Sequence, residues 1–208
     1  MKQAQSSISI NSLYCAIDGK VILSDINFNL NSGQSITITG PNGVGKTLLL
    51  NTIVGFKSIF KGKISINNIN LSNDPTNRQE HIGYYGHKAS LHTGLTVVET
   101  IEYWKAYYSS DANTSELIKF WDLPNKTVES CSEGQRKRLA LVRLSLMNRN
   151  IWILDEPTTN LDFVGKKKFL ELHTSHLRAG GLSIITSHEP AQVKGHKIIN
   201  LERHSGKN

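Results

Sequence analysis

The sequence predicts an α/β protein in which parallel strands lie between helices, and three observations support this fold class. A β-branched run at 35–39 is followed by a glycine-rich loop and then by an apolar run at 48–54. A second apolar run ends in two acids at 155–156, and alternating strand and helix patterns continue to about residue 200. The intervening segment 88–147 has mostly helical patterns. Strands that alternate with helices along a chain are typical of a parallel sheet covered by helices.

The first 80 residues are expected to place strands around a single helix. We predict an antiparallel hairpin from about Ile8 to Leu30, because apolar and β-branched residues recur there. The polar stretch Ser72–Asn77 is predicted to be a loop, since Ser, Asn, Asp and Pro favour turns. In the central segment, we predict helices over Val97–Ser109, Thr114–Trp121 and Glu133–Met147.

The glycine-rich loop spans residues 40–47 and matches the phosphate-binding pattern G-x-x-x-x-G-K-[ST]. It lies between a predicted strand, Ser35–Thr39, and a predicted helix, Leu48–Val54, that ends at Gly55. Glycines let the backbone approach phosphates closely, and loop N–H groups and a helix N-terminus attract them. Lys46 is expected to reach the β- and γ-phosphates and Thr47 to bind Mg²⁺. The predicted nucleotide-binding residues are Gly40, Pro41, Asn42, Gly43, Val44, Gly45, Lys46, Thr47 and Leu48.

The two acids that end the second apolar strand are the predicted catalytic pair. Asp155 closes the strand Ile151–Asp155. It is expected to hold Mg²⁺, directly or through water, as the corresponding acid does in P-loop NTPases. Glu156 is expected to orient and polarise the attacking water as a general base, with Lys46 assisting catalysis. The two motifs together predict an ATPase with ATP and Mg²⁺ as cofactors.

A third segment, Cys131–Arg143, resembles the signature motif of ATP-binding cassette (ABC) ATPases, which is Leu-Ser-Gly-Gly-Gln followed by a basic helix. Ser132, Gly134 and Gln135 match this motif. The resemblance implies that these three residues bind the nucleotide of a second copy, so that the active protein is a homodimer. A helix N-terminus suits this role because it attracts anions. Glu133 replaces a glycine and is expected to weaken the contact with phosphate.

Two further segments extend the resemblance to ABC ATPases over residues 8–200. Thr159–Asp162 resembles the D-loop, and Ser183–Ser187 resembles the strand before the switch histidine. The resemblance implies that His188 is a catalytic residue that senses the γ-phosphate and holds Glu156 and the water. His87 stands where most ABC ATPases have a glutamine in the loop between two lobes, and the resemblance implies that it belongs to the metal site.

The fold implied by the resemblance is a P-loop NTPase cassette in one domain, residues 1–208. It would contain a RecA-like parallel-sheet lobe, an antiparallel β-subdomain and a helical lobe at about 88–147. The aromatic residue that stacks on adenine in this family aligns with Ile17. Tyr14 is the alternative, and it is equally well explained as a strand residue facing the core.

The Gly86-His87 pair, the Thr39-Gly40 entry to the loop and the run Trp152–Pro157 are similar to the ATP-binding export subunits of cytochrome c biogenesis. This resemblance implies haem export or haem delivery, permease partners such as the membrane proteins CcmB and CcmC, and a peripheral location on the cytoplasmic face of the inner membrane. Two alternatives remain. One is a subunit of another ABC transporter, for lipids or lipoproteins. The other is an ABC ATPase that acts on nucleic acid or ribosomes, although no direct nucleic-acid partner is expected.

Composition adds weaker constraints. The N-terminus lacks the apolar core of a signal peptide, and no stretch approaches the ~18 apolar residues of a membrane span. We therefore expect a soluble chain whose transport role needs a separate membrane subunit. The two cysteines, Cys15 and Cys131, are expected to be reduced thiols. His173 and His176 are expected to lie on a solvated helix face rather than to bind a metal together.

The chain has a net charge of +7, with basic runs at 136–138 and 166–168. Three explanations stay open for this charge: an ordinary solvated helix face, an anionic membrane surface, and nucleic acid. Charge alone is poor evidence for any one of these partners.

Overall fold

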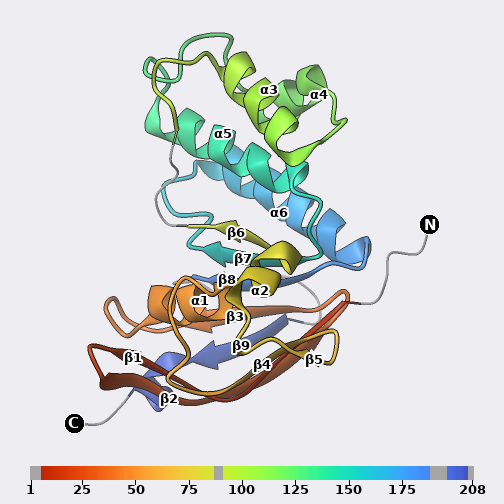
Figure 1. Ribbon diagram of the computed structural model, residues 1–208. Helices are drawn as coiled ribbons and strands as arrows, with labels where there is room; N and C mark the ends of the chain where they lie inside the picture. Colours follow the sequence, from red (N-terminus) through yellow and green to blue (C-terminus); the bar gives the residue numbers. More distant parts are fainter. Residues whose placement is uncertain (1–5, 87–90, 188–195, 206–208) are drawn as a thin grey trace. The chain divides into compact units, whose positions relative to one another are not determined.

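The computed structural model describes residues 6–86, 91–187 and 196–205 (Figure 1). The chain divides into two compact units. The first contains residues 1–84, 149–156 and 175–208, and the second contains residues 85–148 and 157–174. Each unit is built from more than one segment of the chain.

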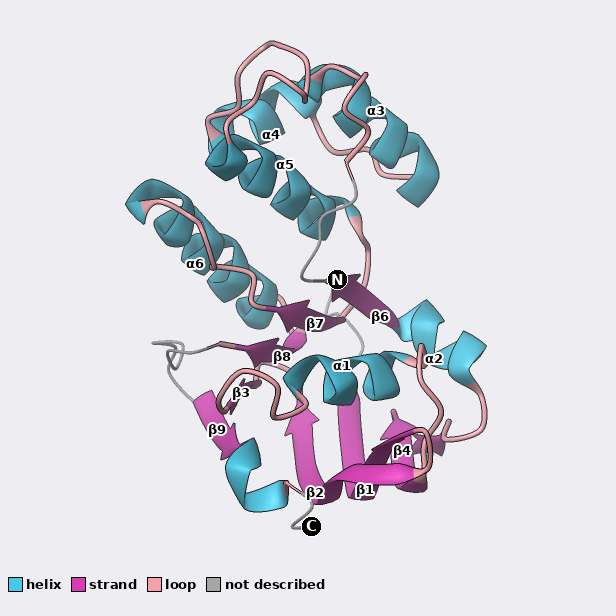
Figure 2. Cartoon of the chain, turned by 90° about the vertical axis from the view of Figure 1, so that its left-hand side faces the viewer, coloured by secondary structure: helices cyan, strands magenta, loops and turns pink. Residues whose placement is uncertain are grey.

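A five-stranded sheet of order β6-β7-β8-β3-β9 belongs to the first unit (Figure 2). β3 pairs in parallel with both β8 and β9, and β7 pairs in parallel with β8. Every residue of β7 and β8 is buried, as expected for parallel strands covered on both faces. The strands are β3 (Ser35–Thr39), β6 (Ile82–Tyr85), β7 (Ile151–Asp155), β8 (Leu182–Thr186) and β9 (His196–Asn200).

An antiparallel sheet of order β2-β1-β4-β5 belongs to the same unit. Strand β1 pairs with both β2 and β4. Ile8 lies directly opposite Leu30, which confirms the predicted hairpin. The strands are β1 (Ser7–Ile17), β2 (Lys20–Asn31), β4 (Lys61–Ile66) and β5 (Ile69–Asn70).

Strand β1 is irregular beside β4. The pairing shifts register between Asn11 and Tyr14, and Ser12 has a φ of 43°. A Cβ atom added to Gly62 of β4 would overlap the Ser12 carbonyl oxygen and would lie 2.7 Å from Leu13 Cα. Gly62 also has a φ of 108°, in the region that favours glycine. A side chain therefore has no room at this position.

One apolar core joins both sheets to helix α1 (Lys46–Val54). Full burial of one Leu or Ile side chain stabilises a fold by roughly 1.5–3 kcal/mol. Gly55 ends α1 with a φ of 100°, and its N–H donates to Asn51 O, as the predicted helix end at Gly55 requires. Core members from the three elements include Ile8, Ile10, Leu30, Ile36, Ile38, Leu49, Leu50, Ile53, Ile153 and Ile184.

The predicted loop Ser72–Asn77 is wrong at its end, because helix α2 begins at Pro75 and continues to His81. The Asp74 carboxylate accepts a hydrogen bond from the Asn77 N–H at 3.0 Å, and Pro75 occupies the first helical turn. Both features are helix-start signals that the same residues can give in place of a turn. Arg78 is buried and donates from Nη1 to the carbonyl oxygen of Thr52 in α1.

The second unit is mostly helical. The predicted helices are confirmed to within one residue: α3 is Val97–Tyr108, α4 is Thr114–Trp121 and α5 is Glu133–Leu146. A fourth helix, α6 (Phe163–Arg178), belongs to this unit up to Thr174. Thr96 and Glu99 form a reciprocal capping box at the start of α3. Such a cap replaces hydrogen bonds that the first turn of a helix would otherwise lack.

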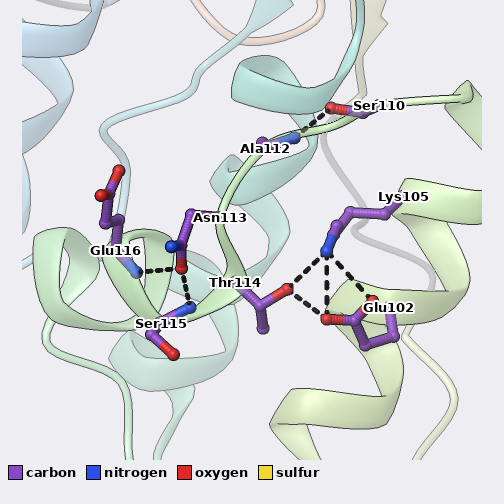
Figure 3. A network of polar contacts seen from close by, with 8 residues as sticks. All are labelled: Glu102, Lys105, Ser110, Ala112, Asn113, Thr114, Ser115 and Glu116. Atoms are coloured by element: carbon purple, nitrogen blue, oxygen red, sulfur yellow. Dashed lines mark hydrogen bonds and ion pairs between the residues drawn. The ribbon is translucent and has the colours of Figure 1, made fainter.

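A polar network joins the end of α3 to the start of α4 (Figure 3). Lys105 Nζ lies 3.1 Å from the Glu102 carboxylate and donates to the Thr114 hydroxyl at 3.0 Å. The Thr114 hydroxyl donates to the same carboxylate. The Asn113 side chain then accepts from the N–H groups of Ser115 and Glu116, which caps α4. All of these contacts join residues that are close in sequence.

The basic run 136–138 is buried only at Arg138, whereas Arg136 and Lys137 are half-buried. Arg138 is buried, and its Nη1 donates to Trp121 O at 3.1 Å and to the Asp122 carboxylate at 3.3 Å. Arg136 donates to Cys131 O at 2.6 Å. Arg138 is therefore not part of a solvated face, and the three explanations for the positive charge stay open for Arg136 and Lys137. In the other run, Lys166 and Lys167 are exposed.

The two cysteines are buried free thiols. Burial raises the pKa of Cys15 to about 11. The prediction of a solvated face for the helix histidines is wrong, because His173 has no exposed surface and His176 stacks on Trp152, with ring centroids 3.6 Å apart. Phe169, His173 and Leu177 recur every four residues and are all buried, so the histidines lie on the inward stripe of α6.

His176 is expected to make stability depend on pH. Burial lowers its pKa from 6.5 to about 4, and Nε2 donates to Leu182 O at 3.2 Å. The unfolded chain therefore binds this proton at a higher pH than the folded chain does. The contribution of neutral His176 to the free energy of unfolding is fully present above pH 6.5 and is lost as the pH falls through about 4. We expect this group to reduce the free energy of unfolding by about 3 kcal/mol over that range.

Urea unfolding at a series of pH values tests this expectation. His176→Phe keeps a flat ring beside Trp152 but cannot titrate. The variant should show a flatter pH dependence of unfolding free energy between pH 4 and 6.5 than the wild type. Equal slopes in the two proteins would rule out His176 as the source of the dependence.

Candidate nucleotide-binding site

The glycine-rich loop connects β3 to α1, as predicted. Gly43 has a φ of 80° and Gly45 a φ of 111°, which L side chains rarely adopt. Gly45 is the N-cap of α1, and no side chain of the described residues caps this helix end. A helix start without a side-chain cap suits an anion, because the first N–H groups of a helix can hold phosphate.

Lys46 lies over this loop with its ammonium group almost buried. Nζ donates to Gly40 O at 2.8 Å and to Pro41 O at 3.3 Å. It also lies 3.9 Å from Glu156 Oε1, in an ion pair whose side chains are 7% and 14% exposed. The structure therefore brings the predicted loop lysine together with the predicted general base.

Thr47 and Asp155 meet across 108 positions of sequence. The Thr47 hydroxyl donates to Asp155 Oδ2 at 2.8 Å, and Asp155 is 1% exposed. Mg²⁺ prefers a few protein oxygens together with substrate phosphates, and a hydroxyl beside a carboxylate provides such oxygens. Within the described residues, no group of three or more His, Cys, Asp or Glu side chains could hold a metal ion. These two residues thus fit a site that shares its ion with a phosphate.

Glu156 is the first residue after β7 and has a φ of 49°. The left-handed conformation costs a non-glycine residue roughly 1–2 kcal/mol, so the surrounding contacts must hold it. Its N–H donates to the Thr186 hydroxyl at 2.9 Å. In this conformation the Glu156 carboxylate lies 3.9 Å from Lys46 Nζ.

Thr186 is a residue of this site that sequence analysis missed. It ends β8, directly beside Asp155 in the parallel pairing of β7 and β8. Its hydroxyl lies 2.6 Å from Asp155 Oδ1 and is fully buried. The only sequence signal is a polar residue at the end of an apolar strand, and that signal does not identify the neighbouring strand.

The signature segment lies in the second unit, at the start of α5. The Ser132 hydroxyl accepts from Gln135 N–H at 3.2 Å, and Gln135 Oε1 accepts from Ser132 N–H at 3.0 Å. A Cβ atom added to Gly134 would have no described atom within 4 Å. The Glu133 carboxylate accepts from Asn160 Nδ2 at 2.8 Å. The segment therefore has an open glycine position beside a carboxylate that Asn160 holds.

Two predicted site residues, His87 and His188, lie outside the described residues. Tyr14, the alternative adenine-stacking residue, is half-buried, and Lys61 Nζ lies 5.1 Å from its ring centroid. Ile17, which aligns with the family's aromatic residue, is 51% exposed. None of the helices within the described ranges combines the length and apolarity that crossing a membrane requires.

Comparison with known proteins identifies the family of this chain. A family model described as ABC transporter matches residues 23–159. The cytochrome c biogenesis ATP-binding export protein CcmA of Cereibacter sphaeroides is 33% identical over 196 residues, covering 93% of this chain and 88% of that protein. The CcmA protein of Histophilus somni is 34% identical over 206 residues, covering 95% of this chain and 94% of that protein.

Solved structures show the same fold. An ABC transporter ATP-binding protein from Pyrococcus furiosus has a TM-score of 0.83 at 25% identity, covering 96% of this chain and all of that one. A dimeric ATP-binding cassette bound to ADP and phosphate has a TM-score of 0.76 at 24% identity, covering 93% and 94%. The α/β fold with a parallel sheet, an antiparallel sheet and helices is that of ABC ATPases, as predicted. The chain therefore belongs to the ABC transporter family, as a nucleotide-binding, ATP-hydrolysing subunit of the CcmA type.

Proposed function

We propose that this protein is the ATP-hydrolysing subunit of an ABC exporter for cytochrome c biogenesis, with haem export or haem delivery as its role. The observation that supports this most strongly is the similarity to CcmA proteins, which extends over 93–95% of the chain for relatives from several organisms. The other transporter classes and the nucleic-acid or ribosome alternative have no comparable support.

The site residues have distinct roles in this proposal. The loop residues 40–47 and Leu48 bind ATP, with Lys46 at the β- and γ-phosphates. Thr47 and Asp155 would hold Mg²⁺, which when bound neutralises charge on the phosphates. Glu156 takes a proton from water as the water oxygen bonds to the γ-phosphorus and the bond to the β-phosphate oxygen breaks, giving ADP and phosphate. From the family resemblance, His188 would hold this arrangement and His87 would contact the metal site.

The proposal includes a homodimer of single-domain cassettes spanning residues 1–208, each with a helical lobe at about 88–147. Ser132, Gly134 and Gln135 of one copy would complete the nucleotide site of the other. The open position at Gly134 supports this role, because a phosphate needs close access to the start of α5. The dimer would bind membrane permease subunits such as CcmB and CcmC on the cytoplasmic face of the inner membrane.

An affinity purification from detergent-solubilised membranes tests the proposed function. The bait is Glu156→Gln with ATP present, and the matched control is Lys46→Ala, which should fail to bind ATP. Mass spectrometry should find the membrane proteins of cytochrome c biogenesis with the bait and fewer with the control. Recovery of a different permease would retain the ATPase and reject the cytochrome c role. Recovery of ribosomal or nucleic-acid proteins alone would reject transport.

A further inference from the structure

Two acids with different predicted tasks share one hydroxyl group. The Thr186 hydroxyl lies 2.6 Å from Asp155 Oδ1 and 2.9 Å from the backbone nitrogen of Glu156. We infer that Thr186 is a positioning residue for ATP hydrolysis, whose hydroxyl holds the metal-binding carboxylate and the general base in fixed relation to each other. This inference rests on the proposed catalytic roles of Asp155 and Glu156.

The direction of both hydrogen bonds follows from the donors available. The Glu156 N–H can only donate, so the Thr186 oxygen accepts from it. The single hydroxyl hydrogen is then donated to Asp155 Oδ1, and 2.6 Å is typical of an O–H group bound to a carboxylate. Thr186 has no exposed surface, so bulk water cannot replace either bond. The Thr186 hydroxyl therefore makes hydrogen bonds both with the Asp155 carboxylate and with the backbone N–H of Glu156.

The hydroxyl leaves the two oxygens of Asp155 with separate partners. Oδ1 is held by Thr186, whereas Oδ2 accepts from the Thr47 hydroxyl at 2.8 Å. Thr47 and Asp155 Oδ2 are the atoms proposed to hold the metal. Fixing one oxygen of a carboxylate orients the other, which is the usual work of groups that contact a metal ligand but not the metal.

Thr186 also holds the backbone of Glu156, the proposed general base. Glu156 has a φ of 49°, and its N–H is tied to the hydroxyl. Its carboxylate lies 3.9 Å from Lys46 Nζ. Without the hydroxyl, the backbone of Glu156 would lose the contact that helps to keep it in a strained conformation. A base that is misplaced by about 1 Å can slow a reaction by about 100-fold.

The position of β8 suits this role. Thr186 is paired with Asp155 of β7 on one side and with Ile38 of β3 on the other. It therefore ends the strand between the one that leads into the glycine-rich loop and the one that ends in the acids. A residue that only filled space here would need its methyl group but not its hydroxyl.

Two matched pairs of full-length proteins isolate the hydroxyl. Wild type and Thr186→Val differ by a hydroxyl against a methyl group, and Thr186→Ser and Thr186→Ala differ by the hydroxyl alone. For each protein we would measure kcat and KM for ATP, Mn²⁺ binding in the presence of ADP by electron paramagnetic resonance, and ADP binding without metal. The last measurement reports a folded glycine-rich loop.

In both pairs, the variant without the hydroxyl should lose about 10- to 100-fold in kcat and in Mn²⁺ affinity. Metal-free ADP binding should change by less than about threefold, since the loop contacts of Lys46 remain. Mn²⁺ affinity and kcat within twofold of the hydroxyl partner in both pairs would overturn the inference. Equal impairment of Ser and Ala would assign the effect to packing of the methyl group.

Failure to fold in both hydroxyl-free variants would also overturn the inference, because it would make the hydroxyl a requirement of the fold. If only Thr186→Val fails to fold, the Ser and Ala pair decides. A wild-type protein without ATPase activity would refute the proposed function. The Mn²⁺ comparison would still test the role of Thr186 in that case.

Discussion

Replacing Glu156 with Gln is expected to lower kcat for ATP hydrolysis by about 100- to 1,000-fold and to change ATP affinity by less than about threefold. The amide keeps the size of the side chain but cannot take a proton from water. Binding should persist because Lys46 still has its contacts with Gly40 O and Pro41 O. Phosphate release under steady-state conditions gives kcat, and equilibrium dialysis with ATP gives the affinity.

The matched control is Glu171→Gln, which makes the same chemical change on an exposed residue of α6. It should hydrolyse ATP at the wild-type rate. Hydrolysis at that rate by Glu156→Gln would show that this carboxylate is not the general base. A loss of ATP binding in Glu156→Gln would instead indicate that the ion pair with Lys46 shapes the loop.

The largest effect on stability is expected for Gly62→Ala. Its methyl group would overlap the Ser12 carbonyl oxygen and would lie 2.7 Å from Leu13 Cα. Both atoms belong to the backbone of β1, so the clash cannot be relieved by rotating a side chain. Together with the φ of 108°, this should reduce the free energy of unfolding by about 3–5 kcal/mol.

Gly19→Ala is the control for this prediction. Gly19 has a φ of 78° in the hairpin turn, and a Cβ atom there would have no atom of the described residues within 4 Å. It should lose only about 1 kcal/mol, the cost of the left-handed conformation. Urea unfolding followed by circular dichroism compares the two variants. A Gly62→Ala protein as stable as Gly19→Ala would mean that β1 and β4 can separate without loss.

Local patterns predicted most of the elements. Ser35–Thr39, Thr114–Trp121 and Ile151–Asp155 match the structure residue for residue, because their strand alternation and helix caps are short-range signals. The predicted loop at Ser72–Asn77 was wrong at Pro75, since an Asp-Pro pair can start a helix as well as a turn. In that case the sequence allows both structures, and the structure has the helix, with Arg78 of α2 bonded to the Thr52 carbonyl oxygen of α1.

Site residues that belong to a continuous sequence motif could be predicted from the sequence. Residues that join the site only through the fold were predicted less well. The loop residues Lys46 and Thr47 lie beside the predicted acids. Thr186 was missed because its role depends on the pairing of β8 with β7, which no local pattern specifies. The inward stripe of α6 was missed because histidines are commonly exposed, whereas the burial of His173 and Leu177 depends on tertiary packing. The roles of His87 and His188 stay predictions from family resemblance.

The place of β3 between β8 and β9 has a consequence for how the chain folds during synthesis. The strand that supports the glycine-rich loop is made among the first 40 residues, but both of its neighbours lie beyond residue 181. The helices α3 and α4 are joined by contacts between residues close in sequence, and such contacts form fast. Because the ribosome releases the N-terminal part first, the helical unit can fold while the loop strand still waits for its partners. The nucleotide site, which is encoded early, is therefore completed only when nearly the whole chain has left the ribosome.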